Sequence, residues 1–126
     1  MSNTKENTTN KMNREFLSDC NLTYAVQLMG GRWKLPILMR LLGEKKRFGE
    51  LKKLIPNITE RMLALQLREL ERDGLVSRTV YAEVPPRVEY ELTAIGNELI
   101  PACLELDKWG AMHKLAHHAD TPSLTD

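Results

Sequence analysis

One stretch of the chain, Asn57 to Leu75, holds side chains that could read nucleic acid. At about 100° per residue, a helix through it gathers three arginines and a leucine on one face: Arg61, Leu65, Arg68 and Arg72. The opposite face carries three leucines, Leu63, Leu67 and Leu70. A guanidinium can donate two hydrogen bonds to guanine O6 and N7, whereas a leucine can only contact a thymine methyl group or a sugar edge. For a lone helix a solvated charged face is the commoner explanation, so the neighbouring elements must indicate whether this face binds nucleic acid.

The residues around this helix predict a helix-turn-helix. Thr59 is placed to cap the helix, and Asp73-Gly74 is placed to end it. A shorter helix closed by Pro56-Asn57 is predicted from the apolar spacing of Phe48, Leu51 and either Leu54 or Ile55. Two short helices joined in this way, the second with a basic outer face, are the arrangement whose second helix enters the DNA major groove.

After Gly74 the apolar pattern changes from that of a helix to that of a strand. Leu75 to Tyr81 is rich in β-branched and aromatic residues, and Val88 to Leu92 alternates apolar and polar side chains. The loop between them, Ala82 to Arg87, holds two prolines, which exclude ladder pairing and stiffen a projecting tip. A helix with a basic face, followed by a hairpin with Arg87 at or near its tip, is the order of a winged helix.

Two further helices are predicted before the helix-turn-helix. The first runs from Tyr24 to Met29, with Asn21 or Thr23 as its cap, and ends at Gly30-Gly31. These glycines do not have the spacing of a nucleotide-binding loop. The second begins around Trp33 to Leu35, because Pro36 is tolerated only near a first turn. Its inward side chains are expected to be Ile37, Leu38, Leu41 and Leu42, and a polar turn is expected over Gly43 to Arg47.

A long final helix, capped by Thr93, carries more apolar surface than one side of a small core needs. Its apolar residues cover more than one stripe: Leu99, Ile100, Cys103, Leu104, Leu106, Trp109 and Met112. This surplus predicts burial against the same helix of a second subunit. The expected homodimer interface contains Leu99, Cys103, Leu106 and Trp109. Pro101 should kink the helix or mark a new start.

Charge is distributed unevenly, although the net charge is only +1. Residues 30–92 contain 13 basic and 9 acidic side chains, whereas residues 93–126 contain 2 and 5, so a nucleic-acid face is expected in the middle. We expect a disordered polar leader at 1–12, one domain at 13–118 and a frayed tail at 119–126. No apolar run approaches the roughly 20 residues of a membrane span, and no secretion signal is visible, so a cytoplasmic protein without membrane contact is expected.

No set of residues predicts catalysis, a cofactor or a metal site. Cys20 and Cys103 are too few for a disulfide framework. His113 and His117 share one helical face, but two imidazoles need further ligands to hold a metal, so a solvated or pH-responsive helix end is expected. Because no nucleophile with a base and an orienting group is evident, the chain is not expected to be an enzyme.

Several motifs in order resemble the HxlR family of small bacterial transcriptional regulators, which is related to the MarR group. They are Gly30-Gly-Arg-Trp-Lys34, Arg47-Phe-Gly-Glu-Leu51, Ile58 through Leu75, and Val84-Pro-Pro-Arg-Val-Glu-Tyr90 with Leu92, Thr93 and Gly96. The resemblance covers Cys20 to Gly110. It implies a mainly α winged helix-turn-helix with a small antiparallel β-hairpin and terminal dimerisation helices, acting as a homodimer on a pseudo-palindromic duplex DNA operator. It also implies that a cysteine just before the first core helix, here Cys20, can sense oxidants or electrophiles.

Two kinds of DNA contact are therefore expected. Base reading is expected from the first half of the Thr59 helix, through Arg61, Leu65, Arg68 and, as a lesser candidate, Gln66. Backbone or wing contacts are expected from Arg72, Arg87, Arg32, Lys34, Lys46 and Arg47. The predicted function is sequence-specific regulation of transcription; the alternative is a winged helix that binds only other proteins. The sequence identifies no small-molecule effector.

Overall fold

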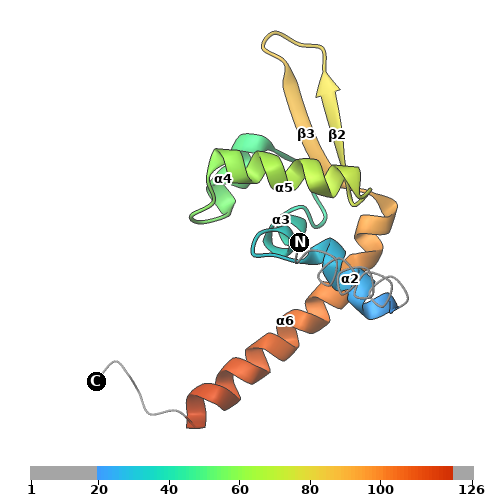
Figure 1. The fold of residues 1–126 in the computed structure, drawn as a ribbon. Coiled ribbons are helices and arrows are strands. Elements are labelled where there is room, and N and C mark those ends of the chain that lie inside the picture. Colours follow the sequence, from blue (N-terminus) through green and yellow to red (C-terminus); the bar gives the residue numbers. More distant parts are fainter. Residues whose placement is uncertain (1–19, 121–126) are drawn as a thin grey trace, which may run out of the picture.

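The computed structural model describes residues 20–120 and is mainly helical, with a small three-stranded antiparallel sheet (Figure 1). This confirms the predicted fold class. The helices are α2 (Asn21–Met29), α3 (Lys34–Arg40), α4 (Phe48–Leu54), α5 (Glu60–Arg72) and α6 (Ala94–Asp120). The strands are β1 (Lys46–Arg47), β2 (Val76–Tyr81) and β3 (Arg87–Leu92). Over this described part, none of the helices has the length and apolarity of a membrane span.

The predicted boundaries of the chain fall partly outside the described residues. The expected leader at 1–12 and the first residues of the expected domain lie outside them, as does most of the expected tail. At the other end, α6 continues to Asp120, two residues past the expected domain boundary at 118.

Helices α2 and α3 differ from the expectation at their ends. Helix α2 begins at Asn21 with Cys20 in the N-cap position, so the predicted caps Asn21 and Thr23 both lie inside the helix. Helix α3 begins after Trp33, as predicted, and buries Ile37, Leu38 and the following Leu41. The prediction for Leu42 was wrong: its side chain is 44% exposed. Because α3 ends at Arg40, the helical period no longer directs Leu42 inward.

The expected turn over Gly43 to Arg47 contains a short strand. Strand β1 pairs antiparallel with β3, with Lys46 opposite Tyr90 and Arg47 opposite Glu89. Two residues are too few to show an alternating pattern, and the strand exists only because β3 offers a free edge. Helix α4 follows at once, and the Arg47 amide donates to the Glu50 carboxylate at 2.8 Å. Of the two alternatives at its end, Ile55 is the buried one and Leu54 is exposed.

Helix α5 begins and ends as its sequence predicts. The Thr59 hydroxyl accepts a hydrogen bond from the Met62 amide at 3.0 Å, which satisfies one free donor of the first turn. At the other end Gly74 has a φ of +77°, and the Leu75 amide donates to the Leu70 carbonyl at 3.0 Å. This left-handed glycine with a bond back to the last turn is a common helix stop.

The hairpin β2–β3 is anchored to both neighbouring helices at its base. Its ladder runs from Val76 opposite Leu92 to Tyr81 opposite Arg87, so residues 82–86 form the tip. Thr93 caps α6 as predicted, accepting from the Gly96 amide at 3.1 Å and donating to the Gly74 carbonyl. A Cβ at Gly96 would lie 2.2 Å from the Leu75 carbonyl oxygen, so only glycine allows this close approach.

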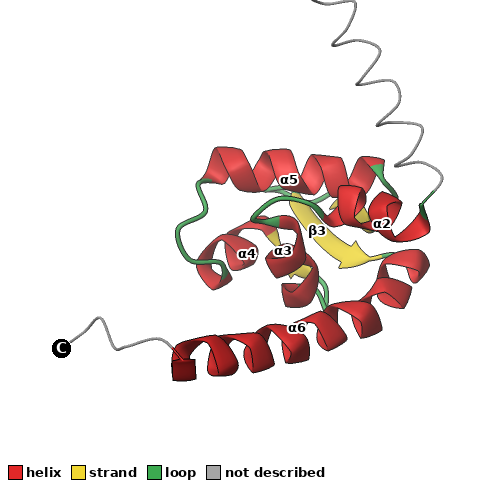
Figure 2. Ribbon diagram, turned by 60° about the horizontal axis from the view of Figure 1, so that its bottom comes forward, coloured by secondary structure: helices red, strands yellow, loops and turns green. Residues whose placement is uncertain are grey.

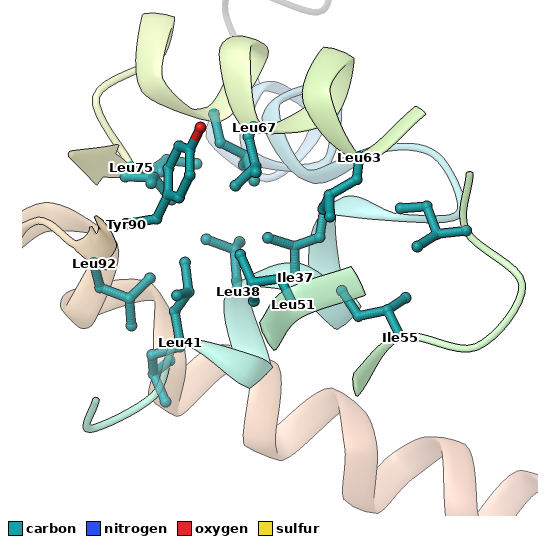
Figure 3. Close-up of a cluster of buried hydrophobic side chains, with 14 residues drawn as sticks. Ile37, Leu38, Leu41, Leu51, Ile55, Leu63, Leu67, Leu75, Tyr90 and Leu92 are labelled. Carbon is teal, nitrogen blue, oxygen red and sulfur yellow. The ribbon is translucent and has the colours of Figure 1, made fainter. Parts of the chain in front are cut away.

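The core lies between α3, α4, α5, α6 and the base of the sheet (Figure 3). It includes the predicted inward leucines of α5, which are at most 1% exposed. Other buried members are Ile37, Leu38, Leu41, Leu51, Ile55, Ile58, Leu75, Val76, Tyr90, Leu92 and Ile100. Helix α6 continues through Pro101 without a new start. Figures 1 and 2 show that it changes direction after its first turns and then extends past the body of the domain.

Candidate nucleic-acid interface

The outer face of α5 presents the stripe that the sequence predicts. Arg61, Leu65, Arg68 and Arg72 are all exposed, and Leu65 is 41% exposed. Within residues 20–118, Arg61 and Arg68 form no ion pair, so both guanidinium groups are available to a ligand. The Nε atom of Arg72 lies 3.4 Å from the Asp73 carboxylate, which partly offsets its charge. In Figure 1 the hairpin β2–β3 rises beside this helix and beyond it.

Gln66 lies at the edge of the outer face. Its side chain is half-buried, and the amide nitrogen donates to the Met62 sulfur at 3.4 Å. The amide therefore already has a partner within the helix, in keeping with its place as the lesser base-reading candidate.

Lys34 has a different environment from the one expected of a phosphate contact. It is 8% exposed, and its Nζ atom lies 2.8 Å from a Glu69 carboxylate oxygen, which joins α3 to α5. The hydrogen bond and positive charge of Lys34 hold the pKa of Glu69 below its usual value. The Lys34 ammonium group is therefore buried against its partner and links α3 to the helix with the basic face.

The other predicted phosphate contacts before α5, namely Arg32, Lys46 and Arg47, differ in their exposure and in their partners. The Lys46 side chain is 15% exposed and lies 3.8 Å from Glu44. The Arg32 guanidinium is exposed and stacks 4.4 Å from the centre of the Trp33 ring. Arg47 is exposed next to the N-terminus of α4. Arg32 and Arg47 are therefore more accessible to phosphate than Lys46 is.

Arg87 stands at the first residue of β3, just inside the wing tip. Its guanidinium carbon lies 4.1 Å from the centre of the Tyr81 ring, and its nitrogens lie 3.2 Å from Glu83 and 3.9 Å from Glu89. The side chain is 30% exposed. The sequence placed Arg87 near the tip correctly but gave no sign of these partners, which depend on the strand register.

Arg78, in β2, is a basic residue that the sequence analysis did not select. Its side chain is exposed on the hairpin, and it is opposite Tyr90 in the ladder. The strand alternation in the sequence could have indicated its position, because Arg78 is two residues from Val76 and therefore lies on the same face of the sheet as that buried residue.

The two cysteines have opposite environments. Cys20 is partly exposed at the N-cap of α2, where a hydrogen bond from the Thr23 side chain, aided by nearby backbone amides, lowers the pKa of its thiol. Cys103 is buried in α6, and burial raises the pKa of its thiol. Of the two, Cys20 is better suited to react as a thiolate.

The predicted interface residues of α6 divide into two groups. Leu99 and Cys103 are largely covered within the chain, whereas Leu106 and Trp109 are 49% and 61% exposed. Met112 and Leu115 extend this exposed apolar surface along the helix. Beside it, an open groove of about 760 Å³ runs between α3 and α6, lined by Leu35, Met39 and Leu106 among others.

The imidazoles near the end of α6 are stacked in a row. The ring centres of Trp109 and His113 are 5.2 Å apart, and those of His113 and His117 are 5.7 Å apart. The described residues contain no group of three or more histidine, cysteine or acidic side chains able to hold a metal ion.

Known proteins are similar to this chain in sequence and in fold. The model of the HxlR-like helix-turn-helix family matches residues 28–118. The HTH-type transcriptional regulator YdeP of Bacillus subtilis (strain 168) is 47% identical over 108 residues, which cover 82% of this chain and 84% of YdeP. An HTH-type transcriptional regulator of Methanothermobacter thermautotrophicus is 50% identical over 94 residues, covering 75% of this chain and 72% of that relative.

Two solved structures extend the comparison. The redox regulator HypR in its reduced form is 42% identical, with a TM-score of 0.75, and the match covers 79% of this chain and 99% of that chain. The reduced form of the transcriptional regulator YodB from B. subtilis is 38% identical, with a TM-score of 0.65, and the match covers 71% of this chain and 89% of that chain.

Proposed function

The chain belongs to the HxlR-like helix-turn-helix family and is a DNA-binding transcriptional regulator, and we propose that it acts as a homodimer. In this proposal helix α5 reads a duplex operator, and the protein catalyses no reaction. The observation that carries the proposal is the exposed stripe of Arg61, Leu65, Arg68 and Arg72 on a helix whose other face is buried. A helix held in this way can enter a major groove as a rigid body.

The base-reading residues are Arg61, Leu65 and Arg68, with Gln66 in a lesser role. Recognition helices read bases mainly from their N-terminal half. Arg61, Leu65 and Gln66 lie in that half of α5, and Arg68 follows as the ninth of its 13 residues. An arginine can grip guanine with two hydrogen bonds, and Leu65 supplies an apolar contact to a thymine methyl group. Arg72 lies one turn beyond Arg68, where a phosphate contact fits better than a base contact.

The phosphate contacts that precede α5 in the chain come from Arg32 and Arg47, with a smaller part from Lys46. Arg32 and Arg47 are exposed, and phosphate contacts fix the orientation of a protein on DNA without carrying sequence information. Lys34 is left out because its ammonium group is buried against Glu69.

The homodimer is supported by the exposed apolar surface of α6. Leu106, Trp109, Met112 and Leu115 are exposed on a helix that extends beyond the body of the domain (Figure 1). Several large apolar side chains exposed on one helix mark an interaction site, and a second copy of α6 would cover them symmetrically. Leu99 and Cys103 would then support the interface from inside the protomer.

The test is selection of genomic fragments by the purified protein, followed by salt titration of the best fragment and of a scrambled duplex of the same length. We expect tighter binding to the selected fragment and affinity that falls steeply with salt, because each neutralised phosphate releases counterions. Equal binding to both duplexes would instead support a winged helix used for protein contacts. Sedimentation of the free protein gives the subunit number.

A response to oxidants through Cys20 is a second part of the proposal. HypR is described as a redox regulator, and Cys20 combines partial exposure with a lowered thiol pKa. Treatment with hydrogen peroxide, which oxidises a single thiolate to a sulfenic acid, should release DNA from the wild type and from Cys103→Ser, while Cys20→Ser should keep its DNA. If Cys20→Ser releases DNA as readily as the wild type, Cys20 is not the sensor.

A further inference from the structure

The two arginines of the hairpin lie on opposite faces of the sheet. In the ladder, Arg78 is opposite Tyr90, whereas Arg87 is opposite Tyr81 and two residues from Glu89. Directly opposed residues share a face and successive residues alternate, so Arg78 lies on the face of Val76, Tyr90 and Leu92. Those three side chains are in the core beneath α5. Arg78 is therefore on the α5 side of the hairpin, and Arg87 is on the other side.

Arg87 belongs to a cluster in which the charges balance. Its guanidinium covers one Tyr81 ring, and the Lys45 ammonium lies 3.4 Å from the Tyr81 hydroxyl and 3.5 Å from Glu89. Two cations, Lys45 and Arg87, thus face two anions, Glu83 and Glu89. The Nε atom of Arg87 is buried and has no hydrogen-bond acceptor in the part of the chain described here. The cluster ties the tip loop to the segment before β1 and offers little net charge to a phosphate.

Arg78 has the opposite properties. Its side chain is exposed, and within residues 20–118 it makes no ion pair or hydrogen bond. Strand β2 is one of the two edge strands of the sheet, in the order β1-β3-β2, and it packs against α5. The tip itself, residues 82–86, contains no basic residue. Arg78 is therefore the free cation of the hairpin on the side of the base-reading helix.

We propose that Arg78 is the DNA-phosphate contact of the wing and that Arg87 is a positioning residue that holds the tip loop through Tyr81 and Glu89. The inference rests on the proposed DNA binding by α5, and it replaces the expectation that Arg87 itself contacts DNA. A phosphate flanking the groove that α5 enters would meet an exposed guanidinium at Arg78 without breaking an existing ion pair.

The experiment compares Arg78→Ala, Arg78→Lys, Arg87→Ala and Arg87→Lys with the wild type on the selected genomic duplex. Loss of one phosphate contact lowers the slope of log affinity against log salt by about 0.9 for each bound chain. The ratio of wild-type affinity to Arg78→Ala affinity should therefore fall about 3.5-fold for each bound chain when the salt is raised from about 50 to 200 mM. Arg78→Lys should restore the wild-type slope, because the charge returns.

Arg87→Ala is the matched control, since it also removes one wing arginine. We expect its slope to equal that of the wild type, with any loss of affinity independent of salt and with faster amide exchange at residues 82–84, the tip residues that are not proline. Arg87→Lys tests whether charge alone matters there. A slope lowered by Arg87→Ala and restored by Arg87→Lys, or a slope unchanged in Arg78→Ala, overturns the assignment. Wild-type binding that does not depend on salt would instead overturn the proposed function, and the assignment with it.

Discussion

Replacing Arg68 by alanine is the sharpest test of base reading by α5. Arg68 is exposed on the outer face and forms no ion pair or side-chain hydrogen bond within residues 20–118, so the fold loses no polar contact when it is replaced. Alanine has the highest helix propensity, so α5 should remain intact. The thermal midpoint of Arg68→Ala should accordingly match that of the wild type, and any change in binding belongs to the interface.

The expected magnitude follows from the geometry of an arginine on guanine. A bidentate pair discriminates against the wrong base by about 1–3 kcal/mol, which corresponds to roughly a 5- to 140-fold loss of affinity for the selected duplex for each bound chain. The loss on a scrambled duplex should be much smaller, because only the charge is missing there. Discrimination between the two duplexes should therefore fall by nearly the whole factor.

Fluorescence anisotropy with a labelled duplex measures these affinities at one fixed salt concentration. A panel in which each base pair is replaced in turn should show that Arg68→Ala loses preference at one position of each half-site and keeps the others. Arg40→Ala is the matched control, since Arg40 is an exposed arginine at the end of α3. Base reading by Arg68 is refuted if Arg68→Ala weakens the selected and scrambled duplexes by the same factor.

Three further predictions concern how the site is held. Thr59→Ala should cost about 1 kcal/mol by removing the α5 cap, measured as a lower urea midpoint, whereas Thr59→Ser should keep the cap. Because Lys34 lowers the pKa of Glu69, this pair stabilises the fold above about pH 4.3, and its contribution is lost as the pH falls through the lowered pKa. In urea titrations across that range, the free energy of unfolding of Glu69→Gln should fall less with acid than that of the wild type. An equal fall would show that the pair does not contribute to this pH dependence. Gly96→Ala should cost about 1–3 kcal/mol or more in thermal unfolding, since its Cβ must displace the Leu75 carbonyl, and an unchanged midpoint would contradict that close contact.

Local signals in the sequence were sufficient for α5 and its neighbours. A capping Thr59, leucines at helical spacing and a stop at Asp73-Gly74 each act within a few residues, so they predict the same helix that the structure contains. The same holds for the caps and strands after it. The prediction for Leu42 was wrong because α3 ends two residues before it. Beyond the end of a helix, the helical period no longer predicts which side chains are buried.

The surroundings of charged residues required the tertiary structure. Lys34 was predicted to contact phosphate, yet its ammonium group lies 2.8 Å from the carboxylate of Glu69, which is 35 positions away in the sequence. Strand β1 was missed for the same reason, since its pairing partner β3 is some 40 residues further on. Pairs of this kind are set by the packing of whole elements, which no local pattern encodes.

The sequence by itself determined which residues form α5 and which of its faces is basic, because helical period and caps are local properties. It also placed a hairpin after that helix and a broad apolar helix at the end. Only the tertiary structure decided which cations are free, because that depends on the strand register and on contacts between distant elements. By that measure Arg61, Arg68 and Arg78 are available, whereas Lys34 and Arg87 already hold partners.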